Sequence, residues 1–539
     1  MKKKKILIIE PSLNTTMLKK LSRYYHTLKH LKPIQIRYQV WYRLRNRFFP
    51  IKYPEEVKPS TFQKLKLAPF PDQYTHYLGD NHFQFLNLDQ TFKEEINWNY
   101  VGHGKLWVYH LNYFDYLHQP EMDWETGEEL IESFLQDLQN RPEGLEPYPV
   151  SLRTINWIKF LSKHDRYPQE IVDSLYAQYQ VLTKKLEYHL LGNHLLENGF
   201  SLLFGAIFFQ DEKLNRLTRK ILKSELEEQV LEDGAHFELS PMYHLILLQR
   251  ALDGYNLLIN NKHELQVVEE QLKEAIQEMV NWLHTIMFSN GDIPMLNDST
   301  GGQALEPKVI LNYAEQLGFL PEKVHLKESG FRKFVAGNFE VVADIGQVGP
   351  TYQPAHAHSD TLSFVLYHQG KPVIVDRGIS TYEKNQIRED ERGTASHNTV
   401  MINSKEQTDV WGGFRVGRRA KPFILEESEL MLMASHTGYD RMGIGHIREW
   451  QVQENKIQII DRIEGDKAEG LAFLHLHPDI EPEQTEEGIF RLNNHILSFD
   501  NFKYVRKEKY AFCLGFNKKV IAYKIRIEFK GVLKTTIKE

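Results

Sequence analysis

Histidine and aspartate residues in the second half of the chain have types and spacings that suit a metal site beside a catalytic group. Residues 355–360 read Ala-His-Ala-His-Ser-Asp and contain His356 and His358, and Asp376 and His397 lie in two later segments. Side chains two apart on a β-strand share one face, so His356 and His358 would point the same way. Two imidazoles and one carboxylate, from His358, Asp376 and His397, suit a Zn²⁺ ion with an open coordination position. His356 would then stand beside the metal as a free base or acid.

A plainer interpretation of these histidines stands beside the metal hypothesis. Pairs of histidines two apart on a strand are often surface or cross-strand pairs. Ligands scattered over three segments are also a weaker signal than a tight CxxC or HExxH motif.

The segments around the histidines carry the signature of β-strands. Alternating apolar runs at 339–345, 361–366 and 372–375 are each bounded by Gly or Pro. A period of two begins near Ser329 and continues toward the C-terminus, for example at 430–434, 457–463 and 521–529. The second half is therefore predicted to be an antiparallel β domain.

The first half shows a helical period instead. From about residue 94 to 318, apolar residues recur at intervals of three and four, as at Leu130, Phe134 and Leu138. Short polar turns between such segments fit an array of antiparallel helix pairs, without the strict repeat of a TPR or HEAT solenoid. A helical half followed by a β half predicts two domains with a cleft between them, where ligand sites are common.

One helical segment carries polar residues that packing does not require. Arg153 and Asn156 are three apart and share a helix face, and Trp157 offers a surface on which a sugar ring could stack. The alternative is a solvated arginine beside a packed tryptophan.

Two further segments contain candidates for a site. Asn193 and His194 precede a strongly apolar run, so Asn193 is either an N-cap or an amide that binds a substrate carboxylate. Near residue 240 a turn that carries Glu238 leads into a predicted helix with Tyr243 and His244. Most tyrosines are core or rim residues, so Tyr243 alone is weak evidence for catalysis.

Length and composition bound the class of protein. A chain of 539 residues with 41% hydrophobic residues exceeds what one core usually supports, so two or three domains are expected. The net charge of −6 argues against a general nucleic-acid binder. The single cysteine, Cys513, excludes an intramolecular disulfide framework.

The N-terminal region has its own charge pattern. Lys2–Lys5 is followed by an apolar run, Ile6–Ile9, that is too short for a signal-peptide core, which favours a cytoplasmic location. The sequence contains no stretch of about 20 apolar residues, so no membrane span is predicted. Residues 18–49 predict one or two basic amphipathic helices that dock on the main body, with binding to a membrane surface as a second interpretation.

These segments occur in the order and surroundings seen in one family: the chain resembles the heparinase II/III-like polysaccharide lyases, which include heparin-sulfate lyases and alginate-lyase-like enzymes. The resemblance runs from residues 105–116 to 411–419 and is most specific in 353–360 and in His397-Asn398-Thr399-Val400. It implies a multidomain α+β fold, an incomplete (α/α) toroid followed by an antiparallel β-sandwich, with an acidic polysaccharide in the cleft. The expected domains are a basic helical extension, a toroid and a sandwich, at 1–93, 94–328 and 329–539.

The resemblance also implies roles for individual residues. Asn193 matches the position that neutralises a uronate carboxylate, where relatives use either an amide or an imidazole, so His194 competes for this role. Tyr243 matches the catalytic tyrosine and His356 the catalytic histidine. A structural metal, taken as Zn²⁺, would be held by His358, Asp376 and His397. Exported relatives carry signal peptides, so the resemblance favours a periplasmic or extracellular location.

The implied reaction is β-elimination: removal of the C5 proton of a uronic acid and expulsion of the 4-linked sugar. Arginine binds carboxylate or sulfate groups bidentately, so arginines near the sandwich motifs are further candidates. The predicted substrate-binding residues are Arg153, Asn156, Trp157, His194, Glu238, His244, Arg392 and Arg415.

Two other functions stay open at this stage. A glycoside hydrolase on the toroid would need two carboxylates facing each other, and Glu197, Glu238 and Asp298 are available. No pair among them explains the histidine-rich segment. A non-catalytic glycan-binding protein of polysaccharide assembly or export would fit the basic N-terminal segment.

Overall fold

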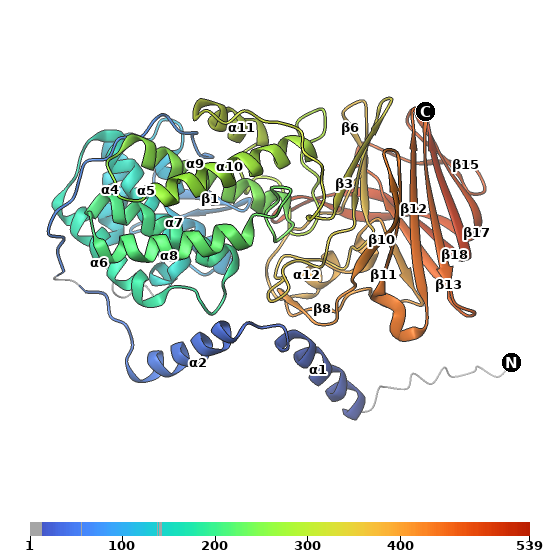
Figure 1. Ribbon diagram of the computed structural model, residues 1–539, viewed down its shortest axis with the longest axis horizontal. Helices are drawn as coiled ribbons and strands as arrows, with labels where there is room; N and C mark the ends of the chain where they lie inside the picture. Colours follow the sequence, from blue (N-terminus) through green and yellow to red (C-terminus); the bar gives the residue numbers. More distant parts are fainter. Residues whose placement is uncertain (1–12, 55–56, 137, 139–142) are drawn as a thin grey trace.

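The computed structural model describes residues 13–54, 57–136, 138 and 143–539, and these form two lobes side by side (Figure 1). The lysine-rich and apolar runs before residue 13 lie outside the described residues. One lobe is helical and the other is built of antiparallel sheets, which confirms the predicted fold class.

The helical lobe is an array of antiparallel helices around an apolar centre. Every residue of its central helix α7 except His194 is buried, because a helix that is apolar on all sides must be enclosed by others. Asp211 caps α8 and Ser240 caps α9 by accepting backbone N–H bonds, so both turns are fixed by short polar side chains. Its helices are α3 (Lys105–Tyr113), α4 (Trp124–Leu135), α5 (Pro147–His164), α6 (Gln169–Lys185), α7 (Gly192–Phe209), α8 (Glu212–Gln229), α9 (Pro241–Asn260), α10 (Gln266–Ile286) and α11 (Pro307–Gln316).

The second lobe contains a four-stranded sheet in the order β3-β4-β5-β6 and a ten-stranded sheet. The large sheet has the order β10-β11-β12-β13-β18-β17-β16-β15, with β14 pairing β18 and β7. One apolar cluster takes residues from both sheets, which is the arrangement of a β-sandwich. The strands are β3 (Phe331–Ala336), β4 (Phe339–Asp344), β5 (Phe364–His368), β6 (Lys371–Ile374), β7 (Val400–Ile402), β10 (Pro422–Ser428), β11 (Met431–His436), β12 (Gly445–Gln453), β13 (Lys456–Glu464), β14 (Gly470–His475), β15 (Glu483–Glu486), β16 (Ile489–Leu492), β17 (His495–Gly515) and β18 (Lys518–Lys538), with short pairs β1 (His82–Phe85) with β2 (Leu88–Thr91) and β8 (Val410–Trp411) with β9 (Arg415–Val416).

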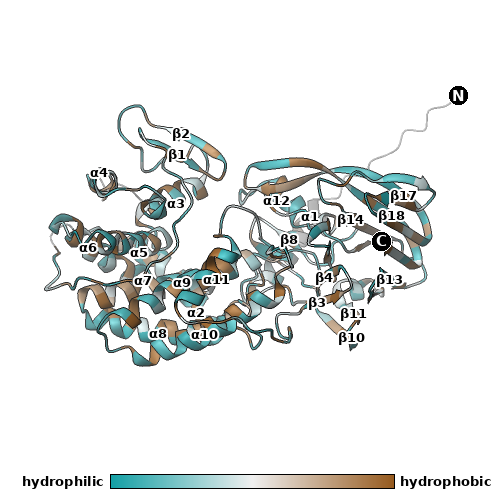
Figure 2. Cartoon of the chain, turned by 90° about the horizontal axis from the view of Figure 1, so that it is seen from above, coloured by the Kyte–Doolittle hydropathy of each residue, from teal (hydrophilic) through white to brown (hydrophobic). Residues whose placement is uncertain are grey.

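Contacts between the two lobes fix their position relative to each other. A buried apolar cluster joins Trp282 and Ile286 of α10 to Phe331, Val342 and Val365 of β3, β4 and β5. The long β17–β18 hairpin reaches the β1–β2 hairpin of the helical lobe (Figure 2), where Asn87 and Asn517 bond backbone carbonyls across the junction. Packing of this kind keeps side chains from the two lobes at fixed distances.

Two N-terminal helices, α1 (Leu13–Leu28) and α2 (Pro33–Phe48), lie along one edge of both lobes (Figure 1). Thr27 of α1 bonds the carbonyl of Val416 in the sandwich, and Tyr38 of α2 stacks on Tyr188 of the helical lobe. The predicted docking of the basic segment is therefore confirmed. Among the described residues, no helix has the length and apolar character that crossing a membrane would require.

Candidate functional site at the junction of the lobes

Three residues singled out from the sequence meet where the lobes join. Asn193 lies in the first turn of α7, Tyr243 in the first turn of α9, and His356 in the loop between β4 and β5. Asn193 Nδ2 is 3.4 Å from His356 Nε2, and the rings of Tyr243 and His356 have centroids 4.0 Å apart. Side chains from both lobes thus form one polar centre.

Backbone strain marks the segments that carry this centre. Leu191, Leu239 and Asn297 have φ values of 62°, 57° and 54°, in the left-handed region that a leucine rarely adopts. Gly192 also has a positive φ, and a Cβ there would lie 2.8 Å from a carboxylate oxygen of Glu238. Such strained residues persist where the surrounding structure holds them, and they are concentrated at functional sites.

Asp298 is the residue that ties the two lobes together at this centre. Its fully buried carboxylate accepts from His356 Nδ1 at 2.9 Å, from His358 Nε2 at 2.8 Å and from both terminal nitrogens of Arg388. Burial alone would raise the pKa of Asp298, but the Arg388 guanidinium and the two histidine bonds outweigh it and hold the pKa well below its usual range. Asp298 is therefore a fixed anion that orients both histidines.

The Asp298 contact sets the tautomer of His356. An ionised carboxylate only accepts hydrogen bonds, so His356 Nδ1 carries the proton and Nε2 keeps its lone pair. That lone pair faces Asn193 and lies beside Tyr243. The arrangement presents an imidazole base to whatever binds there.

Asn193 is held by Glu238. One Glu238 oxygen accepts from Asn193 Nδ2 at 2.8 Å and the other from its backbone N–H at 3.2 Å. An amide nitrogen carries two hydrogens, and the second one of Asn193 faces His356 Nε2, 3.4 Å away. Glu238 is thus a residue that orients Asn193, whereas the sequence suggested a direct substrate contact.

Tyr243 is paired with a second tyrosine that sequence reasoning missed. Its hydroxyl lies 3.3 Å from that of Tyr382, and the Arg388 guanidinium lies over the Tyr382 ring. Burial is the main reason that the pKa values of both tyrosines are raised, so each hydroxyl is protonated at neutral pH. Tyr243 can therefore donate a proton.

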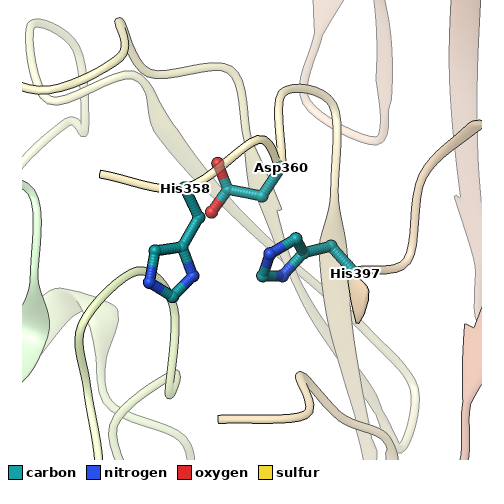
Figure 3. A group of neighbouring side chains, drawn as sticks. All are labelled: His358, Asp360 and His397. Atoms are coloured by element: carbon teal, nitrogen blue, oxygen red, sulfur yellow. The ribbon is translucent and has the colours of Figure 1, made fainter. Parts of the chain in front are cut away.

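A buried metal-binding group lies next to His356. One ligand atom from each of His358, Asp360 and His397 lies within 4.8 Å of the others, and the three side chains converge (Figure 3). Asp298 accepts from His358 Nε2 at 2.8 Å, and Asp376 accepts from His397 Nδ1 at 2.7 Å. The remaining atoms, His358 Nδ1, His397 Nε2 and Asp360 Oδ2, are buried and lack a hydrogen-bond partner. These residues fit a metal ion, since metal-bound histidines usually donate their other N–H to a carboxylate.

This grouping differs from the sequence analysis in two points. Asp360 joins His358 and His397 in the group, and Asp376, the predicted carboxylate ligand, accepts from His397 Nδ1. Residues 355–360 form a loop and no strand, so His356 and His358 do not share a strand face. They converge because both bond the Asp298 carboxylate.

Four predicted substrate-binding residues are buried away from the site. Arg153 bonds Gln178 and backbone carbonyls, Asn156 donates to a backbone carbonyl, and Trp157 is fully buried against Phe114. His244 is buried and bonds the backbone of α10. Each of these side chains is used in the packing of the helical lobe, and its role in substrate binding stays a prediction.

The remaining predicted residues divide into two groups. Arg392 is buried and donates to the carbonyls of Ala357 and Gly413, so it holds the loop that carries His356. Arg415 lies over Trp411 and Tyr24, where it contacts α1. His194 does remain near the centre, half-exposed beside Tyr148. Burial lowers its pKa, but the adjacent Glu187 carboxylate more than compensates and raises it.

The three carboxylates considered for hydrolysis each have another role. Glu197 is buried in an ion pair with Arg250, Glu238 holds Asn193, and Asp298 is enclosed by two histidines and Arg388. None is placed as a free acid opposite a free base. Among the described residues, these three carboxylates therefore form no pair of the kind that inverting or retaining hydrolases use.

A helical toroid is followed by an antiparallel sandwich, and Asn193, Tyr243 and His356 meet at their junction, which defines a two-lobe class of protein. The chain belongs to the heparinase II/III-like family. Its N-terminal family model, "Heparinase II/III N-terminus", matches residues 152–327, and the model "Heparinase II/III-like, C-terminal" matches residues 320–538.

Individual relatives are distant. A heparin-sulfate lyase of Bacteroides stercoris is 26% identical over 309 residues, which are 51% of this chain and 46% of the relative. A heparin-sulfate lyase of Pedobacter heparinus is 23% identical over 265 residues, 44% of this chain and 39% of the relative. The chain thus matches less than half the length of these relatives. A crystal structure of heparinase III shares the fold, with a TM-score of 0.62, 16% identity and coverage of 83% of this chain and 80% of the other.

Proposed function

We propose that the protein is a polysaccharide lyase that cleaves a uronic-acid-containing polysaccharide, of the heparan-sulfate or bacterial exopolysaccharide kind, by β-elimination. The observation that carries the proposal is the convergence of Asn193, Tyr243 and His356 from two lobes on one centre. The heparin-sulfate lyases among its relatives support the substrate class.

The elimination requires three chemical roles, and one or two residues can fill each of them. The amide of Asn193 neutralises the uronate carboxylate, a hydrogen bond that strengthens as charge moves onto the carboxylate. His356 Nε2 removes the C5 proton, or Tyr243 removes it once its own hydroxyl has lost its proton, according to which face of the ring carries it. Tyr243 protonates the leaving oxygen. General acid–base catalysis of this kind contributes about 10²–10⁴-fold.

Ultraviolet absorbance of unsaturated uronate ends is the direct assay. Incubation with heparan sulfate, heparin, hyaluronan, alginate and bacterial capsular polysaccharides should raise the absorbance with one class. Tyr243→Phe and His356→Ala should each lower turnover by at least about 100-fold. Tyr176→Phe, which changes a tyrosine bonded to Asp211 far from the centre, should keep the wild-type rate.

Two outcomes would contradict the lyase proposal. Wild-type rates in both Tyr243→Phe and His356→Ala would remove these residues from the reaction. New reducing ends without a rise in absorbance would indicate hydrolysis, and no reaction with any polymer would favour a glycan-binding role.

We also propose that the His358, Asp360 and His397 group binds Zn²⁺ with a structural role, which would fix the loop that carries His356. The support is the set of three buried, unpartnered ligand atoms. Elemental analysis of the full chain purified without added metal should give about one Zn²⁺ per chain. Asp360→Ala should abolish binding, and Asp376→Asn should weaken it about 10–100-fold.

The metal assignment has a clear contrary result. Retention of metal in Asp360→Ala together with its complete loss in Asp376→Asn would return the ligand role to Asp376. A metal-free chain with unchanged thermal stability would reduce the group to ordinary packing.

A further inference from the structure

The N-terminal helices expose an apolar surface that the proposed reaction does not use. Ile36, Val40, Leu44 and Phe48 of α2 follow one another at intervals of four and therefore share a face. They are between 49% and 62% exposed. Gln35 and Tyr38, on the opposite face, hold the helix against the body. The apolar stripe therefore stays exposed while α2 is docked on the body.

Helix α1 carries a second exposed apolar stripe. Met17, Leu21, Tyr25 and Leu28 recur at intervals of four and three, and each is more than half exposed. Both helices lie along the same edge of the molecule (Figure 1). Exposed apolar stripes on two neighbouring helices usually mark a binding face.

The charge of the same segment identifies its partner. Residues 11–54 contain ten Lys and Arg and no Asp or Glu, in a chain whose net charge is −6. Among the cationic side chains on α2, Arg37, Arg43 and Arg47 are exposed beside the apolar stripe. Large aliphatic and aromatic residues interleaved with arginine suit an anionic lipid surface, where the apolar groups enter the acyl boundary and the arginines meet the headgroups.

We propose that α1 and α2 form a docking face for an anionic membrane surface, on which the two lobes are held by their N-terminal edge. An acidic polysaccharide would be bound by the arginines alone and would leave the apolar stripe in water. A lipid surface covers both, and it is therefore the occupant that the structure favours.

Trp41 provides a local probe of this face. All eight tryptophans lie in the described residues; seven are at most 9% exposed, whereas Trp41, on α2 beside the stripe, is 53% exposed. Tryptophan prefers the membrane–water interface, so its emission should shift to the blue when the face docks.

The test uses the full chain with vesicles of phosphatidylcholine alone or mixed with phosphatidylglycerol. We expect sedimentation with the mixed vesicles only, weakened by high salt, and a blue shift that Trp41→Phe removes without removing binding. Val40→Ser with Leu44→Ser should lower the partition coefficient at least about tenfold. Val267→Ser with Leu320→Ser, which changes equally exposed aliphatics on the helical lobe, should not.

Charge reversal separates the electrostatic contribution. Arg37→Glu with Arg43→Glu should lower the partition coefficient at least about tenfold. Arg216→Glu with Lys223→Glu, exposed cations on α8, should leave it unchanged.

Three results would overturn the proposal. The first is no binding to either vesicle. The second is vesicle binding that survives both α2 double variants. The third is a dimer in sedimentation velocity that the Val40 and Leu44 changes dissociate, since a second copy of the chain would then cover the face. Circular dichroism of each variant confirms that α2 remains helical.

Discussion

Substitution of Asp298 by Asn removes the central negative charge while keeping the shape of the side chain. In the native protein the buried carboxylate accepts from two histidines and from both terminal nitrogens of Arg388. An asparagine turns one acceptor into a donor and leaves the buried Arg388 charge uncompensated. Removing one partner of a buried ion pair costs about 3–5 kcal/mol. At about 2–4 °C per kcal/mol, the thermal midpoint should fall by roughly 6–20 °C.

The same change should affect catalysis through His356. Without the carboxylate, nothing fixes the proton on Nδ1, and the base presented at Nε2 is lost. We expect kcat to fall by at least about 100-fold. KM should change little, because Asp298 is fully buried and orients groups without touching substrate.

Asp253→Asn is the matched control for this prediction. Asp253 is a buried aspartate that pairs with Lys159 at 2.7 Å in the helical lobe. Its loss should lower the thermal midpoint by a similar amount while kcat stays close to wild type. The reasoning would be refuted if Asp298→Asn kept kcat within about twofold, or if both variants lost kcat equally.

Two further predictions concern stability. Gln35→Ala should lower the thermal midpoint by about 2–12 °C, since it leaves the Leu190 carbonyl and the Gln353 side chain without their bonds to α2. Scanning calorimetry measures the midpoint, and an unchanged value would contradict the role of Gln35 in holding α2 to the body. Burial alone would raise the pKa of Asp461, but Arg448 outweighs it and lowers the pKa to about 2. This group therefore contributes about 2–3 kcal/mol above its unfolded pKa near 3.9, and the contribution is lost as the pH falls toward 2. The thermal midpoint of the native chain should fall as the pH is lowered from 5 to 2. An Asp461→Asn variant whose midpoint falls as steeply over the same range would refute the assignment.

Much of the fold could be predicted from local pattern. The change from a period of three and four to a period of two falls between α11 and β3. Predicted strands at 339–345 and 457–463 correspond to β4 and β13 within two residues. The predicted strand at 361–366 begins only at Phe364, because the turn before it carries Asp360 and a left-handed Leu362. Periodicity records which face is buried, and it carries no signal for such a turn.

The candidate site residues that the sequence offered are those whose type suits chemistry. Asn193, Tyr243 and His356 stood out by type and by family resemblance, but nothing local distinguishes Asp298 from other loop aspartates. Its role follows from long-range contacts: it lies 58 residues from His356 and 90 from Arg388 in sequence.

The same limit applies to the predicted arginines. Arg153 and Arg392 carry the chemistry of anion binding, yet both are buried and donate to backbone carbonyls. Arginine has five donors and suits either task, so only burial separates a clamp on substrate from a clamp on the chain. Arg392 shows that the second task still serves the site, since it holds the carbonyl of Ala357 between His356 and His358. The residues that position a catalytic group can thus resemble, in sequence, the residues that bind its substrate.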